Sequence, residues 1–137
     1  MNNFDTKRVA TYGLLIILTL FVVFHLLIMV GIKPFEIVWG GRLKDASQML
    51  SFEAISVMIN LIMLATVSVY AGILQVNINP RVIKVGFWLM FVIFFLNTIG
   101  NLASVNNFEQ MVFTPVTLLL AIFSLRLAIS KEQKLSS

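Results

Sequence analysis

Four long apolar stretches constrain this chain more than any other feature of its sequence. They occupy about residues 9–32, 51–75, 82–104 and 110–130. An α-helix rises about 1.5 Å per residue, so about 20 apolar residues are needed to cross the hydrocarbon core of a bilayer. Each stretch reaches that length. The sequence therefore predicts an all-α integral membrane protein, in which residues 1–137 form one membrane domain with four transmembrane helices.

The composition excludes a water-soluble globule. Hydrophobic residues make up 59% of the chain and charged residues 12%, whereas soluble domains are about 45–50% apolar and about 25% charged. The lack of cysteine and the single histidine exclude thiol nucleophiles, thiolate metal sites and multi-histidine metal centres. No nucleotide-binding or hydrolase motif is present. We therefore expect no cofactor, no metal and no nucleic-acid partner, and we assign no catalytic residue.

The basic residues predict the orientation of the chain, because cytoplasmic loops of membrane proteins carry an excess of Lys and Arg. If the N-terminus is cytoplasmic, seven basic residues lie inside and three lie outside. The inside set is Lys7, Arg8, Arg81, Lys84, Arg126, Lys131 and Lys134, and the outside set is Lys33, Arg42 and Lys44. We predict that both termini are cytoplasmic and that the protein lies in the plasma or inner membrane.

Two of the three connections between the spans are short. Residues 75–80 join the second span to the third, and residues 104–110 join the third span to the fourth. Short connections make sequential helices antiparallel neighbours. The sequence therefore predicts an up-down four-helix bundle.

The outer connection, residues 33–50, is longer and more apolar than a free loop. Its segment 35–39 is expected either to lie among the lipid headgroups or to fold over the outer mouth of the bundle. Trp39 is accordingly either an interfacial anchor or part of a lid over a site. Asp45 has the spacing of an N-cap, with an amide side chain three residues later, which predicts that the second helix begins near Ala46.

The strongly polar side chains within the spans gather in the outer half of the predicted bundle. His25, Asn60, Asn97 and Asn101 all map to a similar depth, whereas the inner half is nearly all aliphatic and aromatic. Polar groups inside a membrane must find a partner or serve a function. We therefore predict a polar pocket lined by these four residues. Its mouth would be formed by Glu36, Trp39, Arg42, Glu53 and Glu109.

A purely structural interpretation of each of these groups is also open. An intramembrane asparagine can hydrogen-bond a neighbouring helix and stabilise packing. Glu53 and Glu109 are expected at helix N-termini, where the helix dipole stabilises a carboxylate. We expect His25 to be a neutral hydrogen-bonding group, because no second titratable residue is expected at its depth.

Three functions are compatible with this pattern. The leading hypothesis is a small membrane protein whose outer polar pocket binds or transports a small amphipathic or lipid-like molecule. The alternative is a non-catalytic assembly or accessory subunit, held together by asparagines and small residues. A membrane enzyme that acts on a lipid at the outer interface comes third. The expected partners are the bilayer and a small amphipathic or lipid ligand, with a homo-oligomer or a larger membrane complex as a further option.

Overall fold

The computed structural model describes residues 2–131, and all regular structure in this range is helical. Four of its helices are long and apolar enough to cross a membrane, so the chain is a multi-pass membrane protein. No strand occurs between residues 2 and 131. The elements are α1 Asn3–Met29, α2 Ala46–Tyr70, α3 Pro80–Leu102, the π-helical turn η3 Glu109–Phe113 and its continuation α4 Thr114–Ala128.

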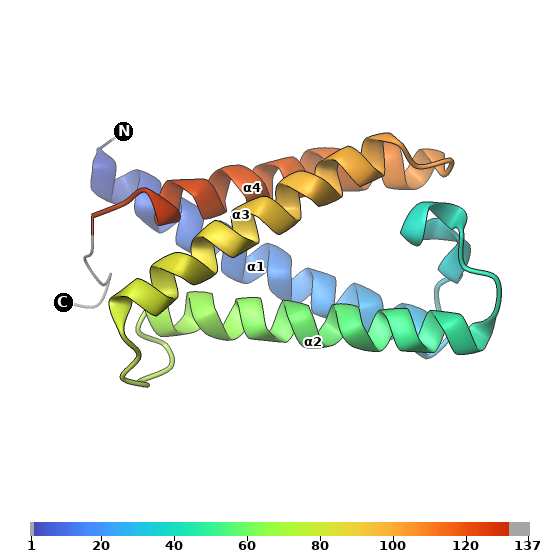
Figure 1. Cartoon of the computed structure of the whole chain (residues 1–137), viewed down its shortest axis with the longest axis horizontal. Helices are drawn as coiled ribbons and strands as arrows, with labels where there is room; N and C mark the ends of the chain where they lie inside the picture. Colours follow the sequence, from blue (N-terminus) through green and yellow to red (C-terminus); the bar gives the residue numbers. More distant parts are fainter. Residues whose placement is uncertain (1, 132–137) are drawn as a thin grey trace.

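The four helices pack as two pairs. α1 lies along α2 and α3 lies along α4, while α1 also packs against α4. α2 and α3 contact each other little, and the two pairs diverge toward one end of the molecule (Figure 1). We call this the cap end, because the connection from α1 to α2 folds there. The opposite end, where α1 starts and α4 finishes, is the basic end.

Glycines in the left-handed conformation end two of the helices. Gly31 and Gly72 both have φ of +77°, a backbone conformation that glycine adopts without steric cost. The amide after each glycine bonds back to a carbonyl in the last helical turn. α2 therefore ends at Tyr70, before the limit of the predicted span at residue 75.

The predicted start of α2 is confirmed. The helix begins at Ala46, and the Asp45 carboxylate accepts a hydrogen bond of 2.8 Å from the Gln48 backbone amide. This bond satisfies one of the amide groups that the first turn of a helix leaves without an intrahelical partner.

The half of the molecule near the basic end is closely packed. Leu14, Leu18 and Val67 are fully buried in an apolar core that all four helices share. The ring of Phe123 occupies the space in which a Cβ atom at position 13 would lie, and Gly13 leaves that space free. The helices therefore approach closely in this half.

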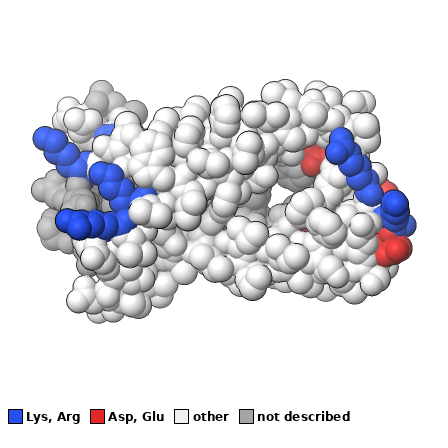
Figure 2. Space-filling view, viewed as in Figure 1, with Lys and Arg blue, Asp and Glu red and all other residues white. Residues whose placement is uncertain are grey.

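Charged side chains lie at the two ends and the middle of the visible face is uncharged (Figure 2). At the basic end, the Arg126 guanidinium donates to the Thr6 hydroxyl at 2.9 Å and to the Asn3 carbonyl at 3.1 Å. These bonds join the end of α4 to the start of α1. They also give hydrogen-bond partners to the Arg126 guanidinium, which lies close to the apolar part of α4.

Candidate functional site

The connection from α1 to α2 folds into a cap over the end of the molecule where the helix pairs diverge. The cap comprises residues 35–42 and contains two short 3-10 turns, η1 Phe35–Ile37 and η2 Trp39–Gly41 (Figure 1). Val38, between the two turns, is buried with Ile28 and Met49 in a small apolar core of its own. The apolar side chains of this segment therefore pack the cap against the helices.

The second turn of the cap has an unusual backbone. Trp39 has φ of 55°, and Gly40 and Gly41 both have φ of 68°. A left-handed conformation costs a non-glycine residue about 1–2 kcal/mol, so other contacts must hold Trp39 in place. Those contacts are hydrogen bonds from this turn to two buried carboxylates, one on each helix pair.

Glu53 is the first of these carboxylates. It is fully buried in α2, and its Oε1 accepts a hydrogen bond of 2.9 Å from Trp39 Nε1. Its Oε2 lies 2.6 Å from Nδ1 of His25 in α1. Two of the sequence expectations are wrong here. Glu53 is not at a helix terminus, because α2 begins two turns earlier at Ala46, and His25 does have a titratable neighbour at its depth.

Glu109 is the second carboxylate, and it belongs to the other helix pair. It is 7% exposed, at the start of η3. Its Oε2 accepts hydrogen bonds from the Gly40 backbone amide at 2.8 Å and from the Ser104 hydroxyl at 2.6 Å. A further bond of 3.0 Å runs from Asn106 Nδ2 to the Glu36 carbonyl. The cap is thus tied to both helix pairs.

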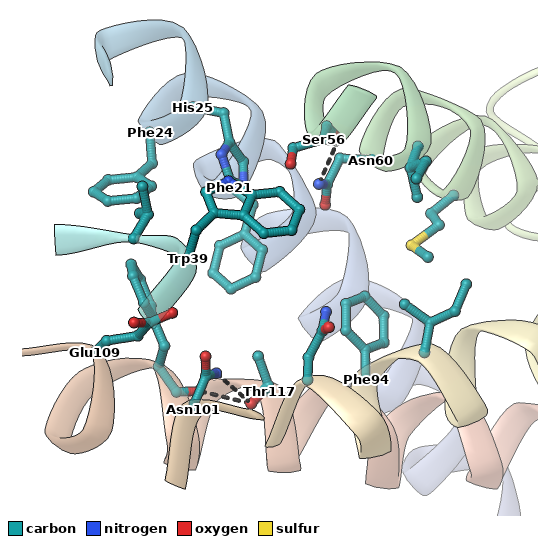
Figure 3. A pocket seen from close by; sticks show the side chains of 16 residues that line it. Phe21, Phe24, His25, Trp39, Ser56, Asn60, Phe94, Asn101, Glu109 and Thr117 are labelled. Carbon is teal, nitrogen blue, oxygen red and sulfur yellow. Dashed lines mark hydrogen bonds between the residues drawn. The ribbon is translucent and has the colours of Figure 1, made fainter. Parts of the chain in front are cut away.

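A cavity of about 220 Å³ lies beneath the cap, between the two helix pairs. It is partly open, and Figure 2 shows the corresponding hollow on this face of the molecule, with an acidic side chain visible in it. Polar and aromatic groups share its wall, as the close view shows (Figure 3). The polar lining residues are His25, Ser56, Asn60, Asn97, Asn101, Glu109 and Thr117, and the aromatic ones are Phe21, Phe24, Trp39, Phe94 and Phe113.

Asn60 points its amide oxygen into this cavity (Figure 3). Its Nδ2 donates a 2.8 Å hydrogen bond to the Ser56 carbonyl in the preceding turn of α2, whereas its Oδ1 is buried and accepts no bond. Three buried side-chain oxygens lack a partner in the described part of the chain, and Asn60 Oδ1 is the one that belongs to a lining residue. An unpartnered buried acceptor costs about 1–3 kcal/mol.

The two asparagines of α3 have different environments. Asn101 is buried, and its Nδ2 donates to the Thr117 hydroxyl of α4 at 3.2 Å. Thr98 contacts the same hydroxyl at 3.0 Å, so this polar cluster joins the two helices. Asn97 lines the cavity and is exposed, and its side chain makes no hydrogen bond within residues 2–131.

The structure brings most of the predicted site residues together. His25, Trp39, Asn60, Asn97, Asn101 and Glu109 line one cavity, and Glu53 lies directly behind His25 and Trp39. The side chains of Glu36 and Arg42 do not line it and are exposed at the cap end. Sequence reasoning missed Ser104, because its bond to Glu109 depends on the conformation of a connection that has no periodic pattern.

The donor set offers little to a metal ion. No group of three or more acidic or histidine side chains comes together within the described residues. Comparison with protein-family models, with curated proteins and with solved structures finds no match to this chain. Any functional conclusion therefore rests on the geometry of the cavity and its cap.

Proposed function

We propose that this protein binds a small amphipathic molecule in the cavity beneath the cap. The observation that carries the proposal is the amide oxygen of Asn60, which is buried, lacks a partner and faces a partly open cavity. In a bilayer a polar group of this kind needs a hydrogen-bond partner. A ligand that enters the cavity and donates a hydrogen bond would supply that partner.

The rest of the lining supports an amphipathic ligand. Rings of Phe24 and Phe113 pack edge to face, with centroids 5.1 Å apart, and Phe21 packs on Phe113 at 5.9 Å. These rings form an apolar wall close to the polar groups of His25 and Asn60. Binding sites for small molecules combine such apolar surface with a few placed polar groups. One end of the ligand is therefore polar and the other is apolar.

We further propose an up-down arrangement in the plasma or inner membrane, with the cap outside and both termini in the cytoplasm. The excess of basic residues at the basic end supports this orientation. The chain has no cysteine, so single cysteines can report the sidedness. A cysteine at Ser47 should react with an impermeant thiol reagent in intact cells, and one at Asn2 should not. Labelling at Asn2 alone would reverse the orientation.

Trp39 provides a direct test of binding. The chain has two tryptophans, Trp39 at the cavity and Trp88 in α3. In a Trp88→Phe variant, para-bromophenethyl alcohol should quench the Trp39 fluorescence by its heavy atom, and the quenching should saturate. The unbrominated alcohol should compete, and Asn60→Leu should weaken the binding. The converse variant, Trp39→Phe, reports how much probe dissolves in the lipid or detergent, because Trp88 does not line the cavity.

The outcome that contradicts the proposal is equally specific. If the quenching of Trp39 rises in proportion to probe concentration, in parallel with that of Trp88, the probe only partitions into the surrounding amphiphile and the cavity binds nothing of this kind.

A packing role is supported for one part of the polar set. The cluster of Thr98, Asn101 and Thr117 bonds α3 to α4, as expected if these residues stabilise helix association. This cluster favours the accessory-subunit hypothesis for the α3–α4 pair alone. It does not account for Asn60 and Asn97, whose side chains do not bond another helix in the described structure.

A further inference from the structure

We infer that the cavity selects a cationic ligand, with a protonated amine at one end and an apolar body at the other. This inference rests on the proposed binding function and names the chemical class of the ligand. It follows from three properties of the lining: the sign of its charge, two acceptor oxygens that lack a partner, and its aromatic surface.

The charge of the cavity is negative. Glu109 is an acidic lining residue, and its Oε2 accepts hydrogen bonds from the Gly40 amide and the Ser104 hydroxyl. The other titratable side chain of the lining, His25, lies with its Nδ1 2.6 Å from Oε2 of the Glu53 carboxylate. No Lys or Arg is among the lining residues. A cation that enters therefore gains a counter-charge, and an anion meets none.

Two acceptors of the lining lack a partner. Asn60 Oδ1 has none, and within residues 2–131 no bond is made to Glu109 Oε1. The side-chain donors of Asn60, Trp39, Asn101 and Thr117 each donate to a protein oxygen, whereas the Asn97 amide and the Ser56 hydroxyl make no hydrogen bond in this part of the chain. A ligand that satisfies the two free oxygens must donate hydrogen bonds, as an ammonium group does.

The apolar part of the wall is aromatic. Phe21 and Phe24 pack edge to face against the His25 ring, and Phe113 packs against both of these phenylalanines in the same wall. The face of an aromatic ring attracts a cation, and the attraction grows when water is excluded. The same rings also accept the apolar body of an amine. Charge, acceptors and rings thus favour one ligand class.

Three probes with the same body and different polar groups test this inference. They are para-bromophenethylammonium, para-bromophenethyl alcohol and para-bromophenylpropanoate, measured by saturable quenching of Trp39 in the Trp88→Phe protein. We expect the ammonium to bind about tenfold more tightly than the alcohol, because a hydrogen bond to a charged group is about twice as strong as a neutral one. The carboxylate should bind the most weakly.

Removing the charge of Glu109 should abolish the discrimination. Glu109→Gln keeps a carbonyl oxygen for the Gly40 amide but carries no charge, so the preference for the ammonium over the alcohol should fall to about threefold or less. Asp5→Asn is the matched control, because Asp5 is exposed in the first turn of α1, at the opposite end of the molecule from the cavity. This control should leave the discrimination unchanged.

The outcomes separate the two proposals. Equal affinity for the three probes, or tighter binding of the carboxylate, overturns the cationic selectivity while leaving binding in the cavity established. Absence of saturable quenching by all three probes overturns the binding function itself. The comparison of probes on the protein with native Glu109 needs no substitution at the cavity, so a variant that folds poorly does not weaken the test.

Discussion

The two halves of this molecule are built from the same four helices but are held together in different ways. In the basic half, the helices interlock through close contacts such as Gly13 against Phe123 and Gly86 against Thr66. In the cap half, the two helix pairs diverge, and one carboxylate from each pair binds the cap that lies between them. The first half depends on one large apolar core, and the second combines a small apolar core around Val38 with a few directed hydrogen bonds.

This difference indicates where the protein can change without unfolding. A close-packed apolar core is intolerant of small displacements, because each methylene group makes many contacts. A cap held by a small apolar core and a few hydrogen bonds can release and re-form its contacts while the larger core remains intact. The division therefore places stability at one end and adaptability at the end that contains the cavity.

The largest expected effect is seen when an apolar side chain is truncated to alanine, once in each half. Leu14→Ala removes a fully buried side chain from the shared core and should lower the free energy of unfolding by about 2–5 kcal/mol. Ile59→Ala removes a side chain that is 38% exposed at the cavity and should cost less than about 1 kcal/mol, since the site is already open. Reversible unfolding in mixed detergent measures both. Equal losses would show that the two halves are packed alike.

A smaller effect is expected at the cap. Glu109→Ala removes the acceptor for the Gly40 amide and the Ser104 hydroxyl, so opening of the cap should become easier by about 1–3 kcal/mol. Hydrogen exchange at the Gly40 amide should accelerate by about tenfold to a hundredfold. Exchange at core amides near Leu18 should stay unchanged. Equal acceleration at both places would mean that the two halves open together.

The sequence was informative about the fold for a physical reason. Four apolar stretches in a bilayer can satisfy their backbone groups only as helices, and the Asp45 cap set the start of α2. The sequence could not indicate where α1 and α2 end, because these ends depend on the left-handed backbone of Gly31 and Gly72 and an isolated glycine inside an apolar run has no periodic signature. Positions that need a left-handed backbone become evident only when the structure gives φ.

The sequence could predict the level at which the site residues lie along their helices, but not which of these residues contact one another. Sequence distance along a helix gives depth, so His25, Asn60 and Asn97 could be placed at one level. It does not give rotation about the helix axis relative to a partner helix. The pairing of Glu53 with His25, and the use of Trp39 as a donor to Glu53, depend on the cap and on that rotation.

The smallest expected effect separates the two asparagines of α3, both of which line the cavity in the cap half, by whether they pack helices or meet a ligand. Asn101→Leu removes the bond from Nδ2 to Thr117 and should lower the free energy of unfolding by about 0.6 kcal/mol, the typical strength of such bonds in a membrane protein. Asn97→Leu removes no bond within the described residues, because this side chain is exposed at the cavity. Its unfolding should be unchanged, while the affinity for para-bromophenethylammonium should fall, because a polar group of the wall is lost. Thermal unfolding of the two variants beside Trp39 quenching gives both readouts on one sample. A loss of stability in Asn97→Leu as large as in Asn101→Leu would make Asn97 a packing residue, and the cavity would then be lined by fewer groups free to meet a ligand.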